Sequence, residues 1–173
     1  EPYRRQRQMC IRDRWWQVIK KAGFKLGAND SYSGATVSYS GYNDEDYADR
    51  SFITRVPRLG NPDIILIFGG INDNWANTPI GEYKYEDFKR ADLYTYRPAL
   101  AKLIELAQEH YPNVTLYFII SDDLKTEIVE STKVVCEHYG IKYVQLQGIE
   151  KESGHPTVKG METIANQVLT LIK

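Results

Sequence analysis

Cysteines and long hydrophobic runs are scarce in this sequence. Its 173 residues contain two cysteines, Cys10 and Cys136, which lie far apart and lack the spacing of metal ligands. Neither a disulfide framework nor a zinc site is therefore predicted. No apolar run approaches the roughly 20 residues that span a bilayer, so we expect no membrane partner. The localisation stays open between the cytoplasm and a secreted or periplasmic location, because any signal peptide would lie upstream.

An excess of charge of one sign is also absent, with 22 basic and 23 acidic side chains. The arginine-rich segment 4–14 would ordinarily indicate a nucleic-acid-binding arm. However, Met9-Cys10-Ile11-Arg12-Asp13 resembles the translation of a transposon-end sequencing adapter, so we interpret residues 1–14 as non-native and expect the gene to continue upstream of Trp15. The remaining 17 basic and 21 acidic side chains give no electrostatic basis for a nucleic-acid partner.

The hydrophobic pattern alternates between strands and helices. Ile64–Phe68 is a continuous apolar run, typical of a strand that is covered on both faces. This alternation predicts an α/β fold in which helices cover both faces of a parallel sheet, a three-layer α/β/α sandwich formed by residues 15–173 as a single domain. Ligands are then expected at the carboxyl ends of the strands. The other expected elements are helices at 15–22, 98–110, 124–138 and 161–169, and strands at 24–26, Thr115–Ile120 and 142–146.

Small polar residues follow the short strand expected at 24–26. In Ser31-Tyr32-Ser33-Gly34, the glycine would let a substrate oxygen approach its backbone N–H, which a Cβ could obstruct. An ordinary Ser/Gly turn is the alternative interpretation of this segment.

A second polar segment, Gly69-Gly70-Ile71-Asn72-Asp73, directly follows the apolar run 64–68. An asparagine held at the end of a strand can donate its amide N–H to a developing oxyanion. Asp73 could brace the loop by accepting backbone N–H groups. The same composition is also common in turns without any catalytic role.

The third segment, Glu152-Ser153-Gly154-His155-Pro156-Thr157, lies just before the last expected helix. Thr157 can cap that helix, and Glu152 could reach back to orient the imidazole of His155, as a general base requires. His110 and His138 fall at expected helix C-termini, where a cation is favourable, so we interpret them as structural.

Together these segments resemble the second, third and fifth blocks of the SGNH (GDSL-like) hydrolases, and they occur in the order of that family. The resemblance runs from about Trp15 to the C-terminus. It implies a flavodoxin-like fold and ester hydrolysis through an acyl-enzyme, with no metal or organic cofactor. It also implies that Gly34 and Asn72 form the oxyanion hole, supported by Gly70 and Asp73, and that His155 is the base.

The sequence departs from the family in two places. The family's first strand and its Gly-Asp-Ser block are absent, so the nucleophile is missing and the chain as written is expected to be inactive. The family usually has an aspartate three residues before the histidine, where this chain has Glu152. The catalytic acid could therefore be Glu152, the nearby Glu150, or neither.

The substrate is less well defined by the sequence, and two other classes of function stay open. Aromatic residues near the expected loops could stack on the sugar rings of a glycan ester, or could simply anchor the loops; a small-molecule ester is equally compatible. One alternative is a noncatalytic module that binds carbohydrate or acyl groups. The other is a nucleotide-binding α/β domain, which no Gly-x-Gly-x-x-Gly or phosphate-loop pattern supports. The aromatic residues concerned are Tyr32, Tyr39, Tyr42, Trp75, Tyr83 and Tyr85.

Overall fold

The computed structural model describes residues 14–173, so the segment interpreted as non-native lies outside the described residues except for Arg14. The described chain forms two compact units. The larger unit comprises residues 27–143, and the smaller unit combines residues 14–26 with 144–173. The single domain expected for residues 15–173 stays a prediction.

A parallel sheet forms the centre of the larger unit. Strand β1 (Ile64–Phe68) pairs in parallel with β2 (Thr115–Ile120), from Ile64 opposite Thr115 to Phe68 opposite Ile119. Strand β3 (Lys142–Gln145) completes the order β1-β2-β3, and the boundary between the two units falls within it. All of β2 after its first residue is buried, which explains its continuous apolar sequence. The predicted α/β class with a parallel sheet is confirmed, whereas the three-layer arrangement stays a prediction.

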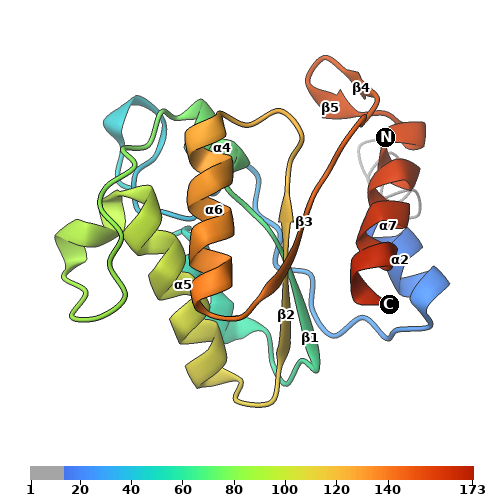
Figure 1. The fold of residues 1–173 in the computed structure, drawn as a ribbon, viewed down its shortest axis with the longest axis horizontal. Coiled ribbons are helices and arrows are strands. Elements are labelled where there is room, and N and C mark those ends of the chain that lie inside the picture. Colours follow the sequence, from blue (N-terminus) through green and yellow to red (C-terminus); the bar gives the residue numbers. More distant parts are fainter. Residues whose placement is uncertain (1–13) are drawn as a thin grey trace. The chain divides into compact units, whose positions relative to one another are not determined.

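Two long helices pack against each other beside the sheet: α5 (Tyr96–His110) and α6 (Thr126–His138) (Figure 1). α5 buries apolar side chains at helical spacing, including Leu100, Leu103 and Ile104, in the same core as Phe118 of β2. Both helices end at a histidine, as predicted. The remaining elements of this unit are η1 (Tyr42–Asp44), α3 (Phe52–Arg55), η2 (Val56–Arg58), α4 (Ile71–Trp75) and η3 (Arg90–Tyr94).

The smaller unit consists of two packed helices and a hairpin. Helix α2 (Arg14–Ala22) lies against α7 (Val158–Ile172), and the Lys21 ammonium donates to the side chain of Asn166 over 3.0 Å. Strands β4 (Lys151–Glu152) and β5 (His155–Pro156) form an antiparallel hairpin just before α7.

The strand predicted at residues 24–26 is wrong. The N–H of Phe24 donates to the carbonyl of Ile19 over 3.0 Å and closes the end of α2, and the following residues are irregular. Phe24 and Leu26 are 36% and 48% exposed, and no strand of the described chain pairs with this segment. Without a neighbouring strand, three alternating residues do not bury enough surface to order as a sheet.

Four other elements have boundaries that differ slightly from those predicted. α5 begins two residues before Pro98, because proline is tolerated in the first turn of a helix, where N–H groups have no partner within the helix. α6 begins at Thr126, α7 extends from Val158 to Ile172, and β3 ends at Gln145.

Thr157 holds the start of α7, as predicted, and provides a test of this local structure. Its hydroxyl oxygen accepts from the N–H of Gly160 over 3.1 Å, and its hydroxyl donates to the Glu150 carboxylate over 2.6 Å. We expect Thr157→Ala to lower the free energy of unfolding by about 1 kcal/mol in urea denaturation. Thr163→Ala is the control, because among residues 14–173 the Thr163 hydroxyl bonds only to a carbonyl of its own helix. Equal effects of the two variants would refute the capping role.

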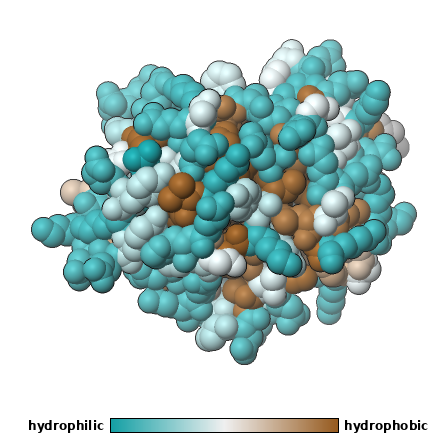
Figure 2. Space-filling model, viewed as in Figure 1, coloured by the Kyte–Doolittle hydropathy of each residue, from teal (hydrophilic) through white to brown (hydrophobic). Residues whose placement is uncertain are grey.

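The surface shown in Figure 2 is mainly hydrophilic, with hydrophobic residues at several places among the polar ones. Within residues 14–173, no helix has both the length and the apolar character needed to cross a bilayer. Trp75, at the end of α4, is 60% exposed, more than any other large hydrophobic side chain described. Because Trp75 lies three residues after Asn72, its exposure bears on the site described next.

Candidate active site

The turn from β1 into α4 places Asn72 and Asp73 at the carboxyl end of the sheet, and two glycines make this turn possible. Gly70 has a φ of +87°, and a Cβ there would lie 2.8 Å from the Tyr96 hydroxyl. A Cβ on Gly69 would approach two neighbouring side chains to 2.9 Å. The chain therefore turns directly from the strand into a helical turn that carries the two polar residues.

A pair of glycine variants separates backbone strain from steric contact in this turn. Gly60 has a similar φ of +76°, but a Cβ there would contact nothing within 4 Å. We expect Gly60→Ala to cost about 1 kcal/mol of unfolding free energy, from the left-handed backbone alone. Gly70→Ala should cost about 3 kcal/mol of unfolding free energy, because steric overlap of the new Cβ with Tyr96 adds to the backbone strain. Denaturant unfolding measures both values, and equal costs would show that the contact with Tyr96 is relieved without penalty.

The side-chain amide of Asn72 is held by two hydrogen bonds. Its nitrogen donates to the carbonyl of Ala35 over 2.8 Å, and its oxygen accepts from the Tyr42 hydroxyl over 2.9 Å. An amide nitrogen carries two N–H groups, so one remains for a ligand. Gly34, next to Ala35, has a φ of +78°, and no acceptor in the described chain pairs with its N–H. The structure thus brings together two of the predicted site residues, each with an N–H to donate.

Asp73 joins the same two segments from below the surface. Its side chain is fully buried, and its carboxylate accepts from the N–H of Val37 over 2.7 Å and of Ser38 over 3.0 Å. Burial raises the pKa of Asp73, and these hydrogen bonds partly oppose that rise. The carboxylate is already occupied by backbone donors, which suits it to hold the segment after Gly34 against α4 rather than to exchange protons with a substrate.

Arg55 holds the segment before Gly34, a role that the sequence analysis missed. Its side chain is only 7% exposed, and its guanidinium donates to the carbonyls of Asp30 and Arg50, the latter over 3.0 Å. It also lies 3.5 Å from the Asp30 carboxylate. Burial lowers the pKa of Arg55, although Asp30 opposes this shift. The sequence offered one signal that Arg55 is buried, which is its position between the apolar residues Ile53 and Val56.

In the smaller unit, a tight hairpin places Glu152 opposite His155. Ser153 and Gly154 form its two-residue turn and have φ values of +50° and +78°, as a type I′ turn requires. Residues opposite each other in an antiparallel pair project from the same face, so Glu152 is placed to reach the imidazole. Both side chains are exposed, and no hydrogen bond or ion pair joins them in residues 14–173. They line an open depression at the start of α7.

Glu150 is engaged differently from Glu152. Its carboxylate accepts from the Thr157 hydroxyl over 2.6 Å and lies 3.9 Å from the Lys159 ammonium. It therefore belongs to the N-terminal cap of α7. Of the two glutamates considered as partners of His155, Glu152 has the more suitable position.

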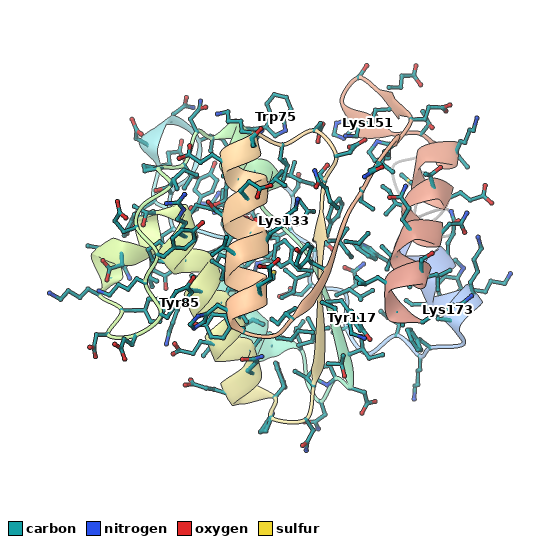
Figure 3. All side chains as sticks on the ribbon, in the orientation of Figure 1. Trp75, Tyr85, Tyr117, Lys133, Lys151 and Lys173 are labelled. Carbon is teal, nitrogen blue, oxygen red and sulfur yellow. The ribbon has the colours of Figure 1, made fainter. Side chains whose placement is uncertain are left out.

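Three of the six aromatic residues considered as sugar platforms are packing anchors. Tyr85 stacks on His138 with ring centroids 3.6 Å apart, at the end of α6 opposite to Trp75 (Figure 3). The Arg97 guanidinium lies 4.2 Å from the centre of the Tyr83 ring, and Tyr39 packs edge-on against Tyr94. For Tyr83 and Tyr85 the structure therefore favours loop anchoring, the alternative to sugar stacking, because their loop packs against the far end of the helix.

The other three aromatic residues lie in the segments that carry Gly34 and Asn72. Tyr42 donates to Asn72, whereas Tyr32 and Trp75 are 55% and 60% exposed. Within residues 14–173, no group of three or more His, Cys, Asp or Glu side chains is arranged to hold a metal ion. The segments of Gly34 and Asn72 carry an amide donor and exposed aromatic side chains.

These features define the class of the molecule as an α/β protein with a candidate ligand site at the carboxyl ends of its parallel strands. The profile of the family described as GDSL-like lipase/acylhydrolase matches residues 4–172. The chain belongs to this family. No curated protein matches the chain.

Two solved structures from Bacteroides species are similar over most of the chain. A protein described as a GDSL-like lipase from Bacteroides ovatus ATCC 8483 is 48% identical, with a TM-score of 0.92 over 94% of this chain and 78% of its own. Its counterpart from Bacteroides uniformis ATCC 8492 is 46% identical, with a TM-score of 0.91 over 92% and 75%. A family two carbohydrate esterase from Clostridium thermocellum in complex with cellohexaose shares the fold, at 16% identity and a TM-score of 0.56 over 81% and 47%.

Proposed function

We propose that this protein is the scaffold of a serine ester hydrolase that cleaves carboxylic esters through an acyl-enzyme. The observation that carries the proposal is the hydrogen bond from the Asn72 amide to the carbonyl of Ala35, the residue after Gly34, whose own N–H has no acceptor in the described chain. Two such donors suit the negative oxygen of a tetrahedral intermediate. Membership of the GDSL-like family supports the same chemistry.

The reaction has two halves. A serine hydroxyl attacks the ester carbonyl while His155 takes its proton, and Gly34 and Asn72 donate to the oxygen that becomes negative. His155 returns the proton to the departing alcohol, and water then attacks the acyl-serine by the same route. Glu152 orients the imidazole. This mechanism needs neither a metal nor an organic cofactor.

We propose that the nucleophilic serine lies outside these 173 residues. The sequence contains no Gly-Asp-Ser, so the proposed reaction needs a nucleophile from residues joined to the chain. We therefore define a serine-bearing form, in which the segment encoded upstream of Trp15 carries Gly-Asp-Ser and adds a strand to the sheet of a three-layer sandwich. The activity experiments below use this form.

Acylated glycans are the substrate class that we favour, with small-molecule esters as the simpler alternative. Tyr32 and Trp75 are both exposed and lie within three residues of Gly34 and Asn72, respectively. Aromatic faces next to the reacting carbonyl suit the apolar face of a sugar ring. The fold is shared with a carbohydrate esterase that binds cellohexaose, although at an identity that supports only the fold.

A second candidate is a noncatalytic module that binds acylated or glycosylated ligands. The sequence feature that favours it is Glu152, which stands where the family usually has an aspartate. Such a module would use the same Tyr32 and Trp75 surfaces without turnover.

Acetate release from an acetylated oligosaccharide separates the two candidates. We expect steady release by the serine-bearing form and none by the 173-residue chain. Release by the 173-residue chain that is abolished by His155→Ala would refute the assignment of the nucleophile. Binding of the oligosaccharide by the serine-bearing form, without release of acetate, would favour the noncatalytic module.

A further inference from the structure

We propose that Tyr42 is a positioning residue, which holds the Asn72 amide and strengthens it as a donor to the oxyanion. The contact that carries this inference is the 2.9 Å hydrogen bond from the Tyr42 hydroxyl to the Asn72 amide oxygen. This inference rests on the proposed function, because it assigns a role within the same reaction.

The two ends of the Asn72 amide are held in complementary ways. Tyr42 donates to its oxygen, while its nitrogen donates to the carbonyl of Ala35 over 2.8 Å. Rotating the amide by half a turn would set its oxygen against the Ala35 carbonyl, which is also an acceptor. With both bonds made, the amide plane is held and the second N–H keeps a constant direction. A donor that is already oriented costs no reorganisation energy as charge develops in the transition state.

The hydrogen bond from Tyr42 also acts through the electrons of the amide. Donation to a carbonyl oxygen draws charge toward that oxygen and makes the attached N–H groups stronger donors, the cooperative effect seen in hydrogen-bonded chains. The phenol must stay protonated to donate. Burial raises the pKa of Tyr42, and the neighbouring Tyr47 and Asp73 raise it further, so the hydroxyl remains a donor at neutral pH.

A tight turn holds Tyr42 itself. An antiparallel bridge joins Ser40 to Asp46, and the N–H of Gly41 donates to the carbonyl of Glu45 over 2.8 Å. The Tyr47 ring packs against Tyr42 with centroids 6.4 Å apart. The phenol is thus placed by local backbone structure and by a neighbouring ring, so that it meets Asn72 from a fixed position.

Kinetics of the serine-bearing form test this role. We expect Tyr42→Phe to lower kcat about tenfold, the equivalent of about 1.4 kcal/mol, and to leave KM unchanged. The control Tyr47→Phe removes a hydroxyl from the adjacent ring of the same cluster and should leave both constants unchanged. In an Asn72→Ala background, Tyr42→Phe should have no further effect, because its partner is gone.

Three kinetic outcomes would overturn the inference: an unchanged kcat in Tyr42→Phe, an equal loss in Tyr47→Phe, or the full tenfold loss persisting in the Asn72→Ala background. A wild-type serine-bearing form without activity would count against the proposed function instead. NMR on the 173-residue chain tests the contact without turnover. Tyr42→Phe should shift the side-chain carbonyl carbon of Asn72 and Tyr47→Phe should not; no shift in Tyr42→Phe would overturn the inference independently of activity.

Discussion

Replacing His155 with alanine is expected to lower kcat of the serine-bearing form by about 10³- to 10⁴-fold. A serine hydroxyl is a weak nucleophile unless a base takes its proton in the transition state, and the departing alcohol needs the same proton returned. The β4–β5 turn presents His155 at the surface, with Glu152 directly opposite. Initial rates of acetate release at saturating substrate measure the effect.

His110→Ala is the matched control for this change. His110 is exposed at the end of α5 and packs edge-on against Tyr111, a structural position. Its replacement should leave kcat unchanged, while circular dichroism verifies that both variants fold. If His155→Ala retained more than about one tenth of the wild-type kcat, the base in this enzyme would have to be another group.

Asn72→Ala should lower kcat by about 10²- to 10³-fold, with a much smaller change in KM. The amide donates to an oxygen that becomes fully negative only in the transition state, so its loss affects the chemical step more than substrate binding. Part of the loss reflects the bond to Ala35, which ties Asn72 to the segment of Gly34.

Asn74→Ala, two residues along the same helix, is the control for Asn72→Ala. The Asn74 side chain accepts from the N–H of Lys125 over 2.8 Å, so its removal should cost stability and leave kcat unchanged. A different result would change the role assigned to Asn72. If KM rose in Asn72→Ala while kcat stayed the same, Asn72 would bind the ground state and the oxyanion role would fall.

The central elements were predictable because their sequences carry local signals. The run Ile64–Phe68 is apolar throughout, and the buried side of α5 repeats at helical spacing, so both were expected within two residues of their observed bounds. Gly34 and Asn72 were predicted as partners because their segments resemble successive blocks of the family. The hydrogen bond from the Asn72 amide to the Ala35 carbonyl joins these two segments.

Long-range contacts explain what the sequence could not indicate. Nothing near Tyr42 or Arg55 in the chain reveals that one meets Asn72, 30 residues away, and the other Asp30, 25 residues away. Similarly, the sequence left open whether Tyr85 stacks on a sugar or anchors its loop, because its stacking on His138 depends on how a long loop returns to α6. The strand predicted at 24–26 is wrong for the opposite reason. Its alternating apolar residues are a local signal, but no strand of the described chain pairs with them.

Labelling with a fluorophosphonate, followed by intact mass spectrometry, tests whether this protein acts through a nucleophilic serine. We expect one covalent adduct per serine-bearing molecule, located on the serine of Gly-Asp-Ser. Its formation should slow sharply in both His155→Ala and Asn72→Ala, because the base and the oxyanion donor act on the same step. The absence of an adduct, or labelling at the wild-type rate in both variants, would contradict the assignment of this protein as a serine ester hydrolase.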